Sequence, residues 1–182
     1  MLHRAIYSTY PPGSTFKPFM ALAGLETGKR SAKQAIHDVG YFNFGGHRFM
    51  DDKIGGHGMV DLHKSIVVSC NTYYYQLAND LGIEGIAGFL APFGFGERTG
   101  IDLPGEATGV LPSPEWKAKN APTQGRWYPG DTVISGIGQG FWKVTPMQMA
   151  QATAALADGW LRRPHLVKDM RAGFAAEWTP VP

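Results

Sequence analysis

The residues that say most about the fold are YPPGSTFKP at positions 10–18. Two prolines and a glycine form a turn stretch that leads directly into a helical pattern from Ser14 to about Thr27. Ser14 is of a type that favours the N-cap, Pro18 is tolerated in a first turn, and Gly28 suits the C-terminal stop. The stretch therefore predicts a helix that begins at Ser14.

The same stretch contains the only Ser-x-x-Lys of the chain, from Ser14 to Lys17. A serine hydroxyl needs a nearby base to act as a nucleophile at neutral pH. Helix positions i and i+3 share a face, so we expect Lys17 to hydrogen-bond the Ser14 oxygen. The positive end of the helix dipole favours a neutral lysine there, which suits a base. The alternative is a capped helix with a solvated lysine, and the motif alone does not separate the two.

A second candidate motif is Ser69-Cys70-Asn71, between two predicted helices. A serine that relays protons and an asparagine that holds a substrate amide are groups that acyl transfer needs opposite its nucleophile. The alternative is an N-cap serine followed by a turn asparagine.

The rest of the pattern is mostly helical. Glycines break up the aromatic residues of 38–60, which predicts short strands or an irregular lobe. The proline-rich stretch 94–140 predicts loops. Helices are expected at 61–68, at 72–81 with Gly82 as the stop, at 84–92, and at 146–158 with Thr145 as N-cap, Gln148 in a capping box and Gly159 as the stop.

The composition is that of an ordinary globular domain, with 182 residues, 43% of them hydrophobic and 18% charged. A net charge of +2, with scattered basic residues, argues against nucleic-acid binding. Cys70 is the only cysteine, which excludes an internal disulfide. No apolar run approaches the roughly 18–20 residues that span a bilayer, and no signal peptide precedes the first motif. We expect any membrane anchor to lie upstream of Met1.

Further segments extend the two motifs in unbroken order: YPPGSTFKP, SCNTYYYQLA, TGIDLPGE, the GDT of 130–132, and GIGQG followed by TPMQMA. Over nearly all of residues 8–165 the chain resembles the elongation-type class B penicillin-binding transpeptidases, the penicillin-binding protein 2 group. The resemblance implies a helix-dominated α+β fragment of the penicillin-binding transpeptidase and serine β-lactamase-like fold, with most of the central sheet missing. Residues 1–182 are then one partial transpeptidase domain, a helical subdomain with a glycine-rich lobe at about 38–60 and no second domain.

The resemblance also implies a function. Members of the family are penicillin-sensitive D,D-transpeptidases on the periplasmic face of the bacterial inner membrane, and they cross-link peptidoglycan stem peptides during elongation. By motif, Ser14 is the acylated nucleophile, Lys17 is its base, and Ser69 and Asn71 form the second catalytic element. Catalysis needs no cofactor. The implied partners are stem peptides, β-lactam antibiotics and membrane proteins of the elongation complex, with no nucleic acid.

One motif of the family is absent. The Lys-Ser/Thr-Gly that lines the substrate cleft and supplies an oxyanion-hole amide does not occur. Arg98-Thr99-Gly100 overlaps the TGIDLPGE stretch, which the family places outside the site. We therefore expect a fragment that starts after the first strands of the sheet, stops before the third motif, and acylates slowly or not at all by itself.

Two carboxylates, an imidazole and a thiolate suit a closed tetrahedral zinc site, and the chain offers such a set in Asp38, Asp51, His57 and Cys70. Some members of the resembled family hold zinc with this set. Three of these residues match its spacing, whereas Asp38 matches only with a two-residue deletion, and Asp52 is an alternative ligand. The hypothesis is a structural zinc that holds the glycine-rich lobe to Cys70. The alternative is a buried thiol, a surface histidine and two solvated aspartates.

Two other functions stay open. A serine β-lactamase shares the first motif but hydrolyses its acyl-enzyme, and no residue here marks a deacylating water. TGIDLPGE favours the transferase. A non-catalytic binding or scaffold module is the third interpretation, because the oxyanion strand is absent.

Overall fold

The computed structural model describes residues 3–167 and 178–180, and the chain divides into two compact units. The Ser14 unit comprises residues 13–87 and 112–141, and the Trp142 unit comprises residues 1–12, 88–111 and 142–182. Both sequence motifs and all the candidate metal ligands lie in the Ser14 unit.

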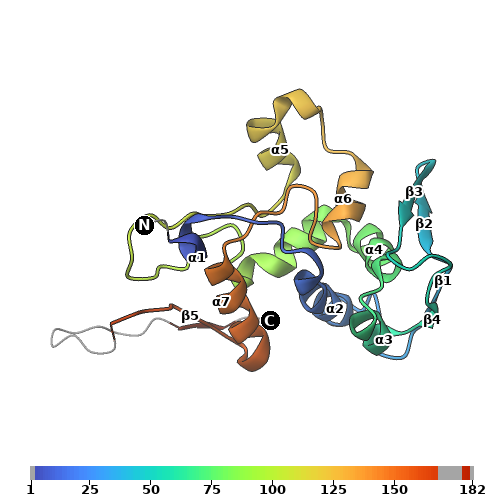
Figure 1. Cartoon of the computed structure of the whole chain (residues 1–182), viewed down its shortest axis with the longest axis horizontal. Helices are drawn as coiled ribbons and strands as arrows, with labels where there is room; N and C mark the ends of the chain where they lie inside the picture. Colours follow the sequence, from blue (N-terminus) through green and yellow to red (C-terminus); the bar gives the residue numbers. More distant parts are fainter. Residues whose placement is uncertain (1–2, 168–177, 181–182) are drawn as a thin grey trace. The chain divides into compact units, whose positions relative to one another are not determined.

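The Ser14 unit is mainly helical, with its strands gathered on one flank (Figure 1). Its helices are η1 (Gly13–Phe16), α2 (Lys17–Glu26), α3 (Leu62–Val67), α4 (Asn71–Leu90, which continues into the Trp142 unit), α5 (Pro114–Asn120), η3 (Pro122–Gln124) and α6 (Pro129–Ser135). Its strands are β1 (Ile36–Asp38), β2 (Tyr41–Phe44), β3 (His47–Met50) and β4 (Gly58–Val60).

The helix at Ser14 differs from the sequence prediction. Residues Gly13–Phe16 form a 3-10 turn, and the α-helix begins only at Lys17. An α-helix starting at Ser14 would need an N–H from residue 18 to bond the Ser14 carbonyl. Pro18 has no N–H, so the entry is a tighter turn.

Other helix ends agree with the sequence. The Asp61 carboxylate accepts a hydrogen bond from the Lys64 N–H at 2.8 Å and caps α3. Gly82 breaks α4 with φ 71° and ψ 164°, values that favour glycine. Prediction missed α5 and α6, because the prolines at 114 and 129 start short helices instead of preventing them.

The glycine-rich lobe consists of two antiparallel strand pairs. β1 pairs with β4, with Asp38 opposite Gly58, and β2 pairs with β3 through a tight turn at Gly45 and Gly46. Gly56 lies so close to β1 that a Cβ atom there would stand 2.3 Å from the Asp38 carbonyl oxygen. The lobe therefore needs its glycines for turns and for close backbone contact.

Large apolar side chains hold the Ser14 unit together. Phe16, Phe19 and Met20 are buried, as are Tyr73 and Leu77 of α4. Each such side chain contributes roughly 1.5–3 kcal/mol by leaving water. A second cluster joins the hairpin to α4 and α6 through Phe49, Tyr75 and Val133, with Phe42, Phe44, Ile134 and Ile137 around it.

The Trp142 unit contains α1 (Arg4–Tyr7), η2 (Ala91–Phe93), α7 (Pro146–Asp158), β5 (Trp160–Arg162) and β6 (Trp178–Pro180). Thr145 and Gln148 form the predicted capping box of α7. The stretch 98–100 lies in a loop, where the buried Glu106 carboxylate accepts bonds from the N–H groups of Thr99 and Gly100. Arg98-Thr99-Gly100 is therefore not a strand motif.

All sheets in residues 3–167 and 178–180 are two-stranded, so the helix-dominated fold class is confirmed. Within that same part of the chain, no helix is both long and apolar enough to cross a bilayer.

Candidate active site and metal cluster

Ser14 is exposed on the η1 turn. The preceding residue, Gly13, has φ +56°, and its N–H donates to the Gly138 carbonyl at 2.9 Å. The backbone before Ser14 is thus fixed from the loop that follows α6.

Ser69 approaches Ser14 from the other motif. Its hydroxyl lies 3.0 Å from the Ser14 hydroxyl oxygen. Ser69 has φ +54°, which makes it the one non-glycine residue of the described chain with positive φ. This left-handed conformation costs a non-glycine residue about 1–2 kcal/mol. Strain of this kind tends to occur where function fixes a side chain.

The Lys17 amine contacts Ser69 and Asn71 of the second motif and does not contact Ser14 directly. The amine is 2% exposed, and it lies 2.5 Å from the Ser69 carbonyl oxygen, 2.9 Å from the Ser69 hydroxyl and 2.6 Å from Asn71 Oδ1. Among the described residues it makes no hydrogen bond to Ser14, contrary to the sequence expectation. The Ser69 hydroxyl stands between them, and we call Ser14, Ser69 and Lys17 the proton relay.

Burial lowers the pKa of the Lys17 amine below its ordinary value, and the negative charges of Asp51 and Asp52 oppose this effect. The amine also lies 5.6 Å from the centre of the Tyr74 ring, a position in which the ring face stabilises an ammonium. Because the pKa of Lys17 is lowered overall, a larger fraction of the amine is neutral than in water, and a base must be neutral to accept a proton. The sequence had attributed this direction to the helix dipole.

Hydrogen-bond capacity defines two states of the relay. An ammonium at Lys17 can donate to all three neighbouring oxygens, which leaves the Ser69 hydroxyl to donate to Ser14. A neutral amine has two donors, for the Ser69 carbonyl and Asn71, and one lone pair that accepts from the Ser69 hydroxyl. In that state the Ser14 hydroxyl donates to Ser69, so a proton has a continuous path from Ser14 to Lys17.

The four predicted metal ligands come together beside the relay. Ligand atoms of Asp38, Asp51, His57 and Cys70 all lie within 4.8 Å of one another, and we call them the four-ligand cluster. His57 Nδ1 is 3.0 Å from Asp38 Oδ2 and 3.5 Å from Asp51 Oδ1. Cys70 Sγ is 3.6 Å from Asp38 Oδ2 and 3.4 Å from Asp51 Oδ2.

These separations fit a tetrahedral metal. Zinc bonds of about 2.0–2.3 Å place neighbouring ligand atoms about 3.3–3.5 Å apart. The mixed oxygen, nitrogen and sulfur donors suit zinc and not magnesium or calcium. Without a metal, burial raises the pKa of the Cys70 thiol far above its ordinary range. The residues present therefore fit a zinc ion.

Backbone N–H groups orient both carboxylates of the cluster. Asp38 accepts from the N–H groups of Gly40 and His57, each at 2.8 Å. Asp51 accepts from the Thr72 N–H at 2.8 Å. Burial would raise the pKa of both carboxyls. Backbone bonds outweigh it at Asp38, and at Asp51 a hydrogen bond with the Asp52 side chain does so together with the backbone bonds, so both pKa values lie below their usual range.

Asp52, the alternative ligand, lies outside the cluster and is exposed. A hydrogen bond with Asp51 raises the pKa of its carboxyl. The geometry therefore favours Asp38 over Asp52 as the fourth ligand.

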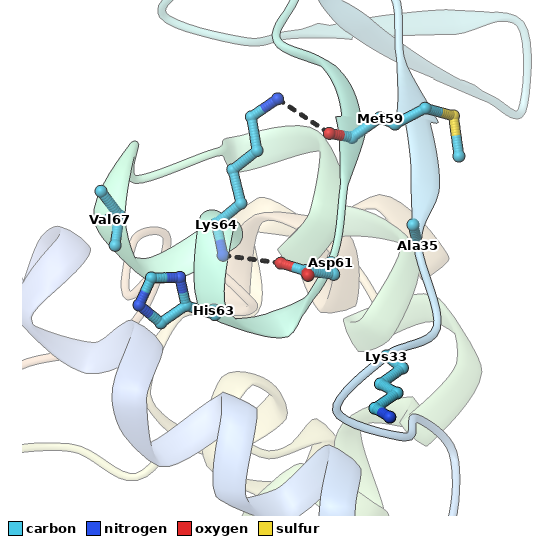
Figure 2. Close-up of a pocket in the computed structure, with 7 residues that line it drawn as sticks. All are labelled: Lys33, Ala35, Met59, Asp61, His63, Lys64 and Val67. Carbon is cyan, nitrogen blue, oxygen red and sulfur yellow. Dashed lines mark hydrogen bonds between the residues drawn. The ribbon is translucent and has the colours of Figure 1, made fainter.

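A groove elsewhere on the Ser14 unit contains none of these residues (Figure 2). Lys33, Ala35, Met59, Asp61, His63, Lys64 and Val67 line it. The Lys64 amine is engaged there, since it donates to the carbonyls of His57 and Met59, each at 2.8 Å. The groove is therefore connected to the cluster through the bond from Lys64 to the His57 carbonyl, and it is not the site of Ser14.

The chain is similar to known proteins over most of its length. A family model for the penicillin-binding protein transpeptidase domain matches residues 1–181. The peptidoglycan D,D-transpeptidase MrdA of Acinetobacter baumannii is 46% identical over 160 residues, which are 87% of this chain and 24% of that relative. The chain spans about a quarter of the length of the curated relatives it matches.

Solved structures are similar over the whole chain. PBP2 of Pseudomonas aeruginosa in complex with WCK 5153 has a TM-score of 0.90 and 41% identity, and the match covers 100% of this chain and 41% of that one. PBP2 of Helicobacter pylori in complex with MreC has a TM-score of 0.89 and 35% identity, covering 98% of this chain and 32% of that one.

Proposed function

We propose a function from the premise that this chain belongs to the penicillin-binding protein transpeptidase domain family: it carries the nucleophile of a peptidoglycan D,D-transpeptidase. The observation that carries the proposal is the relay, in which the Ser14 and Ser69 hydroxyl oxygens lie 3.0 Å apart and Ser69 lies 2.9 Å from the Lys17 amine. These three groups give an activated serine a path for its proton.

Acylation begins at the exposed Ser14 hydroxyl. Its oxygen attacks the carbonyl carbon between the two D-alanines of a stem peptide, and its proton passes through the Ser69 hydroxyl to the neutral Lys17 amine. When the tetrahedral intermediate collapses, the peptide C–N bond breaks. The Lys17 ammonium gives its proton to the leaving amine of the terminal D-alanine, and an ester remains on Ser14.

Transfer repeats these steps in reverse. The amine of a second stem peptide attacks the ester carbonyl, and its proton is taken by Lys17. The C–O bond to Ser14 breaks, and the serine oxygen recovers a proton through Ser69. Asn71 holds the Lys17 amine through its Oδ1 atom, which keeps its NH₂ group free to donate to a substrate amide carbonyl.

The four-ligand cluster supports a structural zinc in this proposal. Asp38, Asp51, His57 and Cys70 would hold it, and the metal would neutralise the carboxylates and stabilise a thiolate at Cys70. Catalysis uses no electron or group from it. Its contribution is to hold the lobe to the segment that carries Ser69 and Asn71.

We propose the periplasmic face of the inner membrane as the place of this reaction, since peptidoglycan lies there. The partners would be stem peptides, β-lactam antibiotics and membrane proteins of cell elongation. A solved complex of Helicobacter pylori PBP2 with MreC supports the last of these.

Labelling by a fluorescent penicillin tests the activity in the full-length protein. We expect one stable covalent label, which mass spectrometry places on Ser14 and which Ser14→Ala removes. Rapid loss of the label would instead indicate a β-lactamase. Absence of any label in a folded protein would indicate a scaffold and contradict the transpeptidase.

A further inference from the structure

The loop after α6 has the sequence Gly136-Ile137-Gly138-Gln139-Gly140, and the relay does not use it. A Cβ atom on Gly136 would stand 2.5 Å from Ala78 Cβ and 2.6 Å from the Tyr74 carbonyl oxygen. Only glycine permits this approach, so the loop is packed directly on α4.

The next glycine fixes the loop against the nucleophile's turn. Gly138 has φ +68°, and a Cβ atom there would stand 2.5 Å from the Gly13 carbonyl oxygen and 2.9 Å from Phe16 Cβ. Its own carbonyl accepts the Gly13 N–H at 2.9 Å. The backbones at 13 and 138 are therefore in contact, and any side chain between them is excluded.

Gln139 is the first side chain beyond this contact, and it is exposed. Apart from Gly13 and its two chain neighbours, its Nε2 atom is the one atom within 4 Å of the position that a Cβ would take on Gly13, at 3.5 Å. Among the described residues its amide makes no hydrogen bond. A free carboxamide, held by two glycine contacts, thus lies beside the turn that presents Ser14.

We propose that the Gln139 side chain binds the acylamino group of the molecule that acylates Ser14. This inference rests on the proposed function. A carboxamide offers one acceptor and two donors, which match the N–H and C=O of a peptide amide. Stem peptides and most penicillins carry such an amide next to the carbonyl that Ser14 attacks. Gln139 is then a substrate-binding residue.

Two penicillins that differ in whether the amine at this position is acylated test the inference in the full-length protein. Benzylpenicillin carries the acylamino group, whereas 6-aminopenicillanic acid has a bare amine at the same carbon. For Gln139→Ala we expect the second-order acylation constant to fall about 3- to 10-fold with benzylpenicillin, the usual effect of one neutral hydrogen bond. With 6-aminopenicillanic acid it should stay within about 2-fold.

The control is Gln124→Ala, which removes another exposed glutamine of the Ser14 unit and should leave both constants unchanged. Equal losses with both penicillins would mean that Gln139 acts on the turn and not on the ligand, and would overturn the inference. No loss with benzylpenicillin would also overturn it. If wild-type protein is not labelled at Ser14 at all, the proposed function fails first, and the inference falls with it.

Discussion

The proton relay and the four-ligand cluster take alternate residues of one short segment, yet they are built in opposite ways. Ser69 and Asn71 serve the relay, while Cys70 and the Thr72 N–H serve the cluster. The relay ends at an exposed hydroxyl and contains a strained residue, Ser69. The cluster is closed and almost wholly buried, and backbone N–H groups orient its carboxylates.

This difference shows how a reactive site is kept in place. The relay is buried and well bonded at Lys17 but open at Ser14, where the proposed mechanism needs a hydroxyl that can meet a substrate. In the proposed mechanism the cluster takes no part in the chemistry, and its ligand groups are held by several hydrogen bonds. Since the two alternate along the segment, rigidity in the cluster fixes the positions of Ser69 and Asn71.

Replacing Lys17, the proposed base, should have the largest effect on the relay. Lys17→Met should lower the rate of penicillin acylation about 1000-fold, since general-base catalysis is typically worth 100- to 10,000-fold. Methionine has a similar volume, so the protein should still fold, although the melting temperature should fall because the Ser69 carbonyl and Asn71 lose their donor. Stopped-flow labelling measures the rate. Lys33→Met, an exposed lysine in the groove of Figure 2, is the control and should have no effect.

The cluster can be broken at its imidazole. His57→Ala removes one ligand of the proposed zinc, so the melting temperature should fall, because a bound structural metal contributes folding free energy. Zinc content should fall with it, and also in Cys70→Ser, when protein purified without chelator is analysed for metals. His37→Ala, at an exposed position of β1, is the matched control.

Zinc that is substoichiometric in the wild type would refute the metal proposal, as would zinc content unchanged by both substitutions. The stability loss alone would not decide it, because loss of the hydrogen bond between the imidazole and Asp38 would also destabilise a metal-free cluster.

The strain at Ser69 separates conformation from chemistry. Ser69→Ala and Ser69→Gly both remove the relay hydroxyl, so both should slow acylation. Glycine accepts φ +54° without penalty, so Ser69→Gly should be more stable than Ser69→Ala by about 1 kcal/mol in denaturant unfolding. Equal stability of the two variants would show that the left-handed conformation is not strained.

The smallest effect concerns the pH profile. In the proposed mechanism the neutral Lys17 amine is the base, so acylation should increase with pH through the pKa of Lys17, which burial lowers below its ordinary value. Tyr74→Leu removes the ring that stabilises the ammonium, and this should move the rise to lower pH by about 0.4–0.7 units. Tyr74→Phe keeps the ring and loses only the hydroxyl bond to Ser65, so its profile should match the wild type. A shift in both variants would argue against the ring.

Local patterns of the sequence predicted much of this structure. The caps at Asp61 and Thr145, the break at Gly82 and the stop at Gly159 need only neighbouring residues, and they are confirmed. The family resemblance is also confirmed. The predicted α-helix start at Ser14 was wrong, because Pro18 has no N–H to bond the Ser14 carbonyl and the α-helix begins only at Lys17.

Long-range geometry was harder to predict. Spacing along a helix suggested that Lys17 contacts Ser14, but Ser69 comes between them from 52 residues away in the sequence. The family resemblance predicted that the metal ligands come together, but the spacing did not decide whether Asp38 or Asp52 is the fourth ligand. The contact of the Tyr74 ring with the Lys17 amine and the position of the Gln139 amide beside Gly13 were missed, because no pattern of neighbouring residues indicates either of them.

The buried thiol has a consequence for measuring motion. Cys70 is the only cysteine of the chain, and its side chain is 0% exposed between the lobe and α4. In the metal-free protein a thiol reagent can reach it only when the lobe separates from the helix, so the rate of its modification under native conditions measures how often these openings occur. The modification rate of this one natural cysteine therefore reports local unfolding around Ser69 and Asn71, and no label has to be added to the protein.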